Sequence, residues 1–463
     1  MAMPMPQRTA PEAQAPKSEE KVGDVFTSLG NYIKFYGSLR LDIAYDTSRT
    51  NYGNWVLYVL PNKPYGQLRV GDNGRRYIEP IVNYNNNNEI AINPRGSRLG
   101  LDIKGTPIET IKAKIGGKVE IDFYGGDFES KEWKAVPRWR KAYLYLDWGW
   151  FELRAGQDQD VVSPLVPRSS DTGASWLLGN LGGRRPQAIF TFKPLFDDTH
   201  RLWAQVSLAR PGDVDGADND MIDRNRDSVF QIASERGDGV QDGEDSGVPM
   251  IQWRLAYEAP LWYKEMPFSV GLSGHWEQYE FRRRLWIAQL QNYSTSVYRL
   301  DSYSLNLEAQ FPILEKPKWT VRGEFFWGRA LADLWGGIFQ GVNPESLLWL
   351  GKPEGVEAYG WWVDTTIQPF DFWALTVGYM MDIPDEGTLP AYDLNLISQT
   401  RFRNQAGFVN TEFFLGSGFM AGFQFMHVMT DYKYVLDTTT NPIVAYQYQA
   451  MDERFLLTAM YSF

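Results

Sequence analysis

Apolar and polar residues alternate along most of this chain with a period of two. The segment 31–46 shows the pattern in two sets of side chains: Ile33, Phe35, Leu39, Leu41, Ile43 and Tyr45 on one face, and Lys34, Tyr36, Ser38, Arg40 and Asp42 on the other. Successive side chains of a β-strand point to opposite faces of its sheet, so one face of this strand is apolar and the other is polar. Such a strand is suited to separating two solvents of different polarity.

Sixteen segments repeat this alternation. They lie near residues 31–46, 96–106, 111–124, 136–147, 149–158, 186–193, 200–210, 249–260, 266–281, 297–313, 317–330, 355–368, 371–382, 400–415, 418–431 and 446–463. The segment 249–260, for example, places Ile251 and Trp253 on one face and Gln252 and Arg254 on the other. Strands of soluble sandwiches alternate as well, so a single segment does not identify the class of sheet.

The connectors between these segments do separate the classes, because short ones alternate strictly with long ones. The short connectors lie at 106–110, 147–149, 194–199, 260–265, 312–316, 369–370 and 416–418, and the long ones at 47–95, 125–135, 159–185, 211–248, 282–296, 331–354, 383–399 and 432–445. Bacterial outer-membrane barrels have this asymmetry, with short periplasmic turns and longer extracellular loops. The sequence therefore predicts an all-β fold, a transmembrane antiparallel up-and-down β-barrel of sixteen strands, favoured over fourteen or eighteen.

Domain organisation follows from the same pattern, since residues 31–463 are expected to form a single barrel domain. Residues 1–30 precede the first alternating segment, and as far as Gly23 they are rich in Pro, Ala, Gln, Glu and Lys. That composition cannot bury a core. We expect residues 1–30 to form a disordered periplasmic arm.

Composition narrows the possible functions. The 463 residues include no Cys, carry a formal net charge of −11 and are 15% aromatic. Without Cys, disulfides and thiolate metal or redox sites are excluded, and the acidic balance argues against nucleic-acid binding. No stretch approaches the roughly 18 apolar residues that a membrane-spanning helix needs. His200, His275 and His427 belong to no Ser/His/Asp set or HExxH motif, so we expect neither an enzyme nor a bound cofactor.

The C-terminal segment carries the alternation to the last residue, with Phe455, Leu457, Ala459, Tyr461 and Phe463 on one face. This ending resembles the C-terminal strand of Gram-negative outer-membrane β-barrels. The resemblance implies location in the Gram-negative cell outer membrane and insertion by the outer-membrane assembly machinery, with Tyr461 and Phe463 in the assembly signal. It also implies a barrel wall in contact with outer-membrane lipid and lipopolysaccharide.

The chain also resembles the general Gram-negative porins, and four short motifs are similar to the DcaP-like porins: Ser97–Gly100, Arg140–Tyr143, Leu153–Gln157 and Gly183–Pro186. The resemblance implies a water-filled channel for passive diffusion of small hydrophilic solutes, and a homotrimer. A sixteen-stranded barrel is in the size range in which the lumen stays aqueous. The N-terminal arm departs from the DcaP-like pattern, because its prolines prevent the long periplasmic helix that those proteins usually carry.

In porins of this type the third long loop folds into the barrel and narrows the pore. The corresponding connector here is Gln159–Arg185, whose apolar residues favour packing against the inner wall over exposure to water: Val161, Val162, Leu165, Trp176, Leu177, Leu178 and Leu181. The alternative is a surface flap or a subunit-contact loop.

Charged residues are expected to set the selectivity of the pore. Arg or Lys on the lipid face near the midplane costs about 2–4 kcal/mol, so the basic residues of the first three strands belong in the lumen. We predict that the constriction depends on these bases and on charges of the inward loop: Lys34, Arg40, Arg98, Lys114, Lys118, Asp158, Asp160, Arg168, Asp171, Arg184 and Arg185. Rings of Arg or Lys line anion-passing pores. Asp42, Glu120 and Asp122 share the same faces, so at most a mild anion preference is expected; alternatively, the charges only keep the lumen hydrated.

Two other functions stay open on the sequence. One is a substrate-specific channel with a saturable site for a dicarboxylate or a sugar, for which Trp203 and Trp362 point inward by parity as stacking candidates. The other is an adhesion or receptor barrel with a closed lumen.

The long connector 211–248 is rich in carboxylates that could bind Ca²⁺. The candidate ligands are Asp213, Asp215, Asp218 and Asp220. This run lacks the Gly at the sixth position that an EF-hand loop requires, so a hydrated acidic mouth is favoured over a metal site.

Overall fold

The structure is a computed structural model, and it describes residues 24–26, 32–61, 65–70, 76–81, 88–125, 135–194, 199–212, 220–222, 231–233, 242–261, 267–343, 346, 352–390, 400–437 and 444–463. Sixteen strands close into one antiparallel barrel, which confirms the predicted fold and strand number. These strands are β2 (Tyr32–Asp46), β8 (Arg98–Lys104), β9 (Lys114–Gly125), β10 (Val136–Asp147), β11 (Phe151–Gln159), β12 (Arg184–Phe192), β13 (Arg201–Ala209), β16 (Met250–Ala259), β17 (Phe268–Ile287), β18 (Asn292–Leu314), β19 (Lys318–Arg329), β20 (Glu357–Phe370), β21 (Trp373–Pro384), β22 (Thr400–Gly416), β23 (Phe419–Asp437) and β24 (Val444–Ser462).

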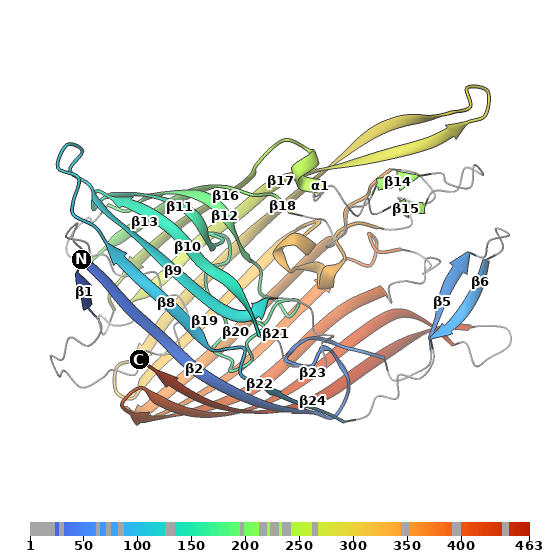
Figure 1. Cartoon of the computed structure of the whole chain (residues 1–463). Coiled ribbons are helices and arrows are strands. Elements are labelled where there is room, and N and C mark those ends of the chain that lie inside the picture. Colours follow the sequence, from blue (N-terminus) through green and yellow to red (C-terminus); the bar gives the residue numbers. More distant parts are fainter. Residues whose placement is uncertain are drawn as a thin grey trace.

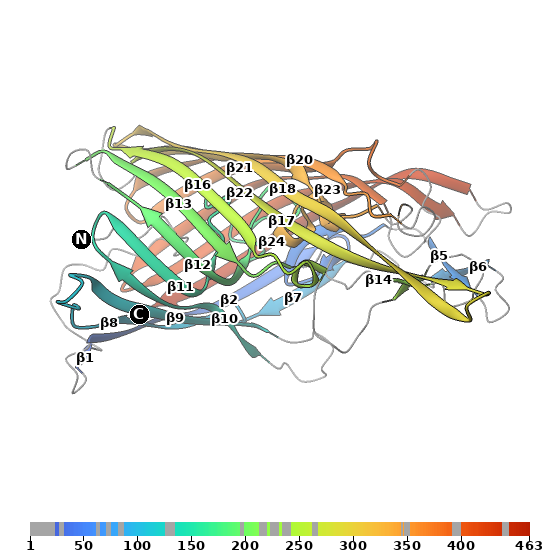
Figure 2. The ribbon, with the colours of Figure 1, turned by 90° about the horizontal axis from the view of Figure 1, so that it is seen from above.

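The barrel closes where its first strand meets its last (Figure 1, Figure 2). β2 pairs with β8 along one edge and with β24 along the other, where Ser38 lies opposite Ser462. The short connectors and the C-terminus lie at one end of the barrel, which we call the short-turn end; the other is the long-loop end. The described chain contains no helix that is long and apolar enough to cross a membrane.

The wall has the two faces that the alternation predicted. Leu39 and Leu457 point outward and are 58% and 54% exposed, whereas Asp42 and Gln424 point inward and are buried. Hydrocarbon offers no hydrogen bonds, so a closed ladder of paired strands with an apolar outer face is one of the few structures that lipid tolerates.

The described chain also contains shorter strands and helices in addition to the sixteen barrel strands. Four strands extend its sheet, namely β1 (Asp24–Phe26), β7 (Glu89–Asn93), β14 (Asp220–Ile222) and β15 (Gln231–Ala233). Two hairpins form separate two-stranded sheets, β3–β4 (Thr50–Tyr52 and Trp55–Val59) and β5–β6 (Tyr65–Val70 and Arg76–Ile81). The helices are α1 (Asp242–Asp245), η1 (Ala332–Leu334) and η2 (Gly337–Phe339). Of the predicted arm, residues 1–30, only β1 lies within the described residues; it pairs with β2.

The prediction of a long loop at 282–296 was wrong. β17 and β18 are 20 and 23 residues long and stay paired up to Ile287 and Asn292, forming a ribbon that projects beyond the long-loop end (Figure 1). β16 pairs with β17 only as far as Trp276. Beyond the barrel rim neither face of the ribbon borders lipid, so its sequence does not show the apolar alternation of a membrane strand.

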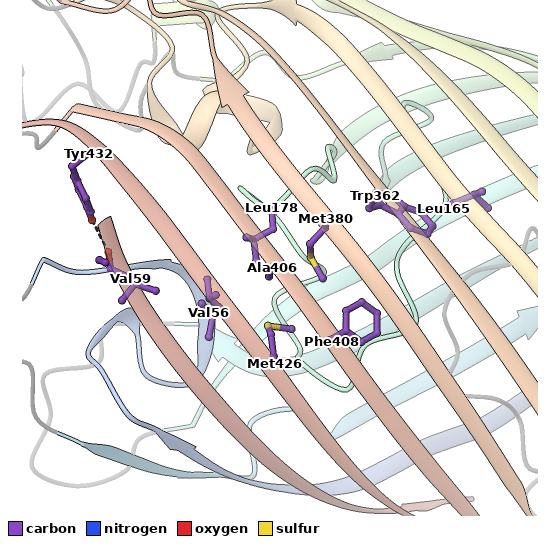
Figure 3. Packing of buried hydrophobic residues seen from close by; sticks show 12 residues of the cluster. Val56, Val59, Leu165, Leu178, Trp362, Met380, Ala406, Phe408, Met426 and Tyr432 are labelled. Atoms are coloured by element: carbon purple, nitrogen blue, oxygen red, sulfur yellow. Dashed lines mark hydrogen bonds between the residues drawn. The ribbon is translucent and has the colours of Figure 1, made fainter. Parts of the chain in front are cut away.

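Three long connectors, rather than the third alone, contribute buried side chains to the interior. Figure 3 shows Val56 and Val59 of β4 and Leu165 and Leu178 of the third connector packed against wall residues such as Phe408. The Tyr432 hydroxyl donates to Val59 O at 2.6 Å. The inward folding of the third long loop is thus confirmed, whereas that of the other two was not predicted. The connector from β19 to β20 also folds inward. It carries η1 and η2, and its Leu334 and Ile338 are fully buried.

Candidate pore constriction

The connector 160–183, here called the constriction loop, leaves β11 and follows the inner wall strand by strand. Several of its backbone N–H groups donate to lumen-facing side chains, among them Val161 to Gln252 Oε1 of β16 at 2.9 Å, Leu165 to Glu324 Oε1 of β19 at 2.8 Å, and Arg168 to Asp364 Oδ2 of β20 at 2.6 Å. A loop with little secondary structure cannot satisfy its own amides, so the polar inner wall does so.

The middle of the loop is held by an ion pair and two serines. Arg168 Nε donates to Glu412 Oε2 of β22 at 2.7 Å. Gln424 Oε1 of β23 accepts hydrogen bonds from Ser169 Oγ at 2.9 Å and from Ser170 N–H at 2.5 Å. Arg168, predicted to contribute to selectivity, is therefore occupied in anchoring the loop.

The loop then reaches the seam between β24 and β2. Arg40 Nη2 donates to Ser170 O at 2.5 Å, and Arg40 Nε lies 2.8 Å from Asp42 Oδ2. Asp171 Oδ2 lies 3.3 Å from Arg454 Nε. Burial raises the pKa of the Asp171 carboxyl, and the Arg454 guanidinium acts in the opposite direction. Arg40 and Asp171 thus meet at the constriction, each with a partner of opposite charge.

The returning half of the loop packs on the connector that carries η1 and η2. Trp176 stacks on Trp335 with ring centroids 4.6 Å apart, and Leu177 N–H donates to Trp335 O at 3.1 Å. Gly179 has a φ of +99°, and a side chain there would collide with the carbonyl oxygen of Trp361 on β20. Glycine permits both the φ and the close approach. The constriction is therefore composite, since two connectors build it.

Arg185 ties these two connectors together. Its Nε lies 2.9 Å from Asp160 Oδ1, and its Nη1 lies 2.5 Å from Asp333 Oδ2 on η1. The Arg185 side chain is buried. Burial raises the pKa of Asp333, and the charge of Arg185 opposes that shift. Asp160 and Arg185 were both predicted as selectivity residues, and here they neutralise each other.

Basic residues gather on the wall formed by β8 to β12. We call Arg98, Arg138, Arg140 and Arg184 the arginine strip, because Arg184 is close enough to the other three to interact with their charges. Two carboxylates face the strip: Arg140 pairs with Glu120 at 2.7 Å and with Asp122 at 3.0 Å, and Arg138 pairs with Asp122 at 2.8 Å.

Arg184 differs from the other arginines of the constriction. Its guanidinium lies 5.9 Å from the centre of the Trp176 ring, and it forms no ion pair with any residue that the structure describes. Four guanidinium groups and two carboxylates leave this wall with an excess of positive charge.

Arg138 and Arg140 were not among the predicted site residues. The available signal was the outward Trp139 between them, which is 57% exposed and places both neighbours in the lumen by parity. Lys141 also points inward, next to Arg140, because the register between β10 and β9 shifts between Trp139 and Lys141. Strict alternation cannot predict such a bulge.

Other predicted site residues lie elsewhere. Lys114 begins β9 opposite Asp147 at the short-turn end and is exposed, as is Lys34 near the start of β2. Lys118 Nζ lies 4.6 Å from the centre of the Tyr36 ring. Asp158 accepts from Arg154 Nη1 at 2.5 Å. The structure therefore brings Arg40, Asp160, Arg168, Asp171, Arg184 and Arg185 to the constriction loop, and leaves Lys34 and Lys114 near the short-turn end.

The stacking candidates have little free surface. Trp362 is 1% exposed and donates from Nε1 to Glu324 at 3.2 Å, and Trp203 is 6% exposed with Arg201 over its ring. Of the calcium candidates, Asp213, Asp215 and Asp218 lie outside the described residues and Asp220 belongs to β14. Within the described ranges, no three His, Asp or Glu residues form a group that could hold a metal ion.

A polar recess of about 300 Å³ opens beside the composite constriction. Its lining combines three arginines with an acid, an amide and an indole: Gln157, Arg184, Arg185, Arg210, Asp333 and Trp335. Arg185 and Arg210 are paired with acids, Arg210 with Glu244 at 2.6 Å. Arg184 therefore supplies the excess charge of the recess.

No family model and no curated protein matches this sequence. Among solved structures, the chain is similar to the outer membrane channel DcaP of Acinetobacter baumannii, with 16% identity, a TM-score of 0.61, and coverage of 96% of this chain and 100% of that one. OmpT of Vibrio cholerae gives 11% identity, a TM-score of 0.48, and coverage of 95% and 100%. Salmonella typhi OmpF in complex with daunomycin gives 11%, 0.46, and 95% and 100%. The chain folds as a closed sixteen-stranded antiparallel barrel, and its solved structural neighbours are outer-membrane porins and channels such as DcaP.

Proposed function

We propose that this protein is a porin of the Gram-negative outer membrane through which small hydrophilic solutes diffuse passively. The observation that carries the proposal is a closed barrel with a polar inner face, narrowed by a loop bonded to residues such as Gln252 and Glu324. A wall of this kind satisfies every backbone group in lipid. A barrel of sixteen strands is large enough to keep an aqueous lumen.

A mild anion preference belongs to the same proposal. Within the constriction, Arg40, Arg168 and Arg185 are each paired with an acid, so they add little net field. The arginine strip has more guanidinium groups than carboxylates, and a permeating anion would meet a positive potential beside it. Glu120 and Asp122 keep that preference mild.

Planar-bilayer recording tests both parts. The purified protein should give open-channel conductance, and Arg184→Gln should move the reversal potential in a salt gradient toward cations. Lys114→Gln removes one positive charge at the short-turn end and serves as the matched control, which should shift the potential much less. Absence of conductance would refute the channel. Strong cation selectivity in the unmodified protein, or no shift with Arg184→Gln, would refute the anion assignment.

A substrate-specific channel is the second candidate, favoured by the polar recess. Arg184 and Trp335 line it together, and they would offer a charge and an aromatic face to a dicarboxylate or a sugar. A saturable site predicts solute block of the conductance that levels off with concentration and is lost in Trp335→Ala. Block that stays linear in solute concentration supports the general porin, and a lack of any conductance supports an adhesion or receptor barrel.

The assembly state is also a proposal. A homotrimer inserted by the outer-membrane assembly machinery, in contact with lipid and lipopolysaccharide, follows from the porin fold as an expectation. Native mass spectrometry in mild detergent tests it, and a purely monomeric mass would remove the trimer while leaving the channel in place.

A further inference from the structure

A groove of about 570 Å³ crosses the outer wall from β20 to β23. Its lining is mostly apolar and includes Val363, Val377, Tyr379, Val409, Phe425 and His427. Gly407 of β22 also lines the groove. It lies opposite Tyr379 of β21 on one side and opposite His427 of β23 on the other. A wall that only has to face lipid could be covered evenly by side chains, so this depression requires a reason.

Packing within the chain does not explain Gly407. A Cβ added there would meet no atom closer than 3.6 Å, and its φ is not positive. At Gly378 and Gly360 an added Cβ would collide with the rings of Phe408 and Phe326, so those glycines make room for neighbours inside the barrel. Glycine within a strand weakens it, and often marks a bulge, a tight bend, or a place where a ligand or another backbone approaches closely. The pairing of β22 with both neighbours runs through Gly407 without a register shift, so no bulge accounts for it.

The groove is amphipathic along the barrel axis. Toward the short-turn end, the outward positions beside it are apolar, with Val409 opposite Phe425. Toward the long-loop end, His427 Nδ1 lies 2.7 Å from Glu453 Oε1, and beyond it Arg403 pairs with Asp431 at 2.5 Å. An occupant that fits has a long apolar part and polar atoms at one end only.

We propose that this groove binds an acyl chain of a lipid in the extracellular leaflet, a step that rests on the membrane location proposed above. The polar end of the groove faces the long-loop end, which is how a lipid of that leaflet would be oriented. Since His427 and Arg403 are each paired with an acid, the groove offers hydrogen bonds rather than net charge. His427 Nε2 has no partner among the described residues and could bond to an ester or hydroxyl oxygen of the lipid.

Photolabelling in proteoliposomes tests the proposal. The full chain is reconstituted in phosphatidylethanolamine vesicles that contain a phospholipid with a diazirine on its acyl chain, and labelled peptides are mapped by mass spectrometry. We expect labelling of the β22 and β23 peptides with Val409 and Phe425 to exceed several-fold that of the β13 peptide. Gly407→Leu, which places a side chain in the groove and whose Cβ meets no atom closer than 3.6 Å, should reduce it to the β13 level. Ala204→Leu on β13, opposite the outward and exposed Leu255, is the matched control and should change nothing.

Three results would overturn the inference: equal labelling around the wall, unchanged labelling in Gly407→Leu, or labelling of the β22 and β23 peptides below that of the β13 peptide. Conductance is measured on the same samples, so the two proposals fail separately. Uniform labelling with normal conductance removes only the acyl-chain site, whereas selective labelling without conductance removes only the channel.

Discussion

Individual charges in this lumen act mostly through their partners. Alternation along single strands predicted that Arg40 and Asp42 face inward, and the structure shows them paired at 2.8 Å. It could not predict that Arg168 meets Glu412, because 244 positions separate them and the meeting depends on the path of a loop. A sequence pattern therefore indicates which charges enter the lumen, but not which of them remain unbalanced there.

Arg185→Gln should loosen the constriction while leaving the barrel folded. Breaking a buried ion pair by removing one partner costs about 3–5 kcal/mol, and Asp160 and Asp333 would lose the cation between them. We expect a larger or more variable single-channel conductance and new proteolytic cleavage in the constriction loop. Arg299→Gln is the control, because its pair with Glu280 is exposed and worth about 0–1 kcal/mol. A recording identical to that of the unmodified protein would contradict the role of Arg185.

Replacing Phe463 with Ser should reduce membrane insertion in cells more than it reduces the stability of refolded protein. The ring is 46% exposed and lies 5.7 Å from the Phe35 ring, and its backbone N–H and C=O pair with Gly37, which the substitution retains. Complete burial of such a side chain is worth about 1.5–3 kcal/mol, so a half-exposed ring contributes less. Outer-membrane yield and the urea midpoint in detergent measure the two effects. Equal proportional loss of both would mean that the residue is structural only.

At the scale of elements, prediction succeeded where lipid borders the chain. β10 and β22 run close to the predicted 136–147 and 400–415, since only an alternating strand satisfies an apolar exterior and a polar lumen together. The prediction of elements failed for strands whose two faces have similar surroundings, because such strands need not alternate. The ribbon of β17 and β18 includes residues 282–296, which were predicted as a long loop. The alternation also did not predict β4, whose Leu57 is fully buried inside the barrel.

Shortening the ribbon should leave the barrel and the channel intact. Between Trp276 of β17 and Tyr303 of β18, the strand residues pair with one another and with β14. They do not pair with the neighbouring wall strands β16 and β19. We expect a chain in which residues 284–295 are replaced by a two-residue turn to keep its heat-dependent mobility on SDS gels and its conductance. Loss of the folded band would show that the ribbon supports the barrel.

At the scale of the whole molecule, net charge and lumen charge are separate quantities. The chain carries −11 overall, with an acidic run in the connector 211–248, whereas the arginine strip gives one inner wall an excess of positive charge. Selectivity depends on the local potential that a solute meets in the constriction. Composition alone could not reveal this, because it sums charges that lie on different surfaces.

The composite constriction leads to a prediction about how its two parts combine. Trp176 and Leu177 of the constriction loop pack with Trp335 and Ile338 of the connector from β19 to β20, so each segment supports the position of the other. Deleting residues 172–178 should raise the single-channel conductance, and deleting residues 333–339 should also raise it. Because either deletion already releases the partner segment, the double deletion should increase conductance by less than the sum of the two. Conductance changes that add would show that the segments narrow the pore independently, and a single deletion with no effect would show that the loop does not limit passage.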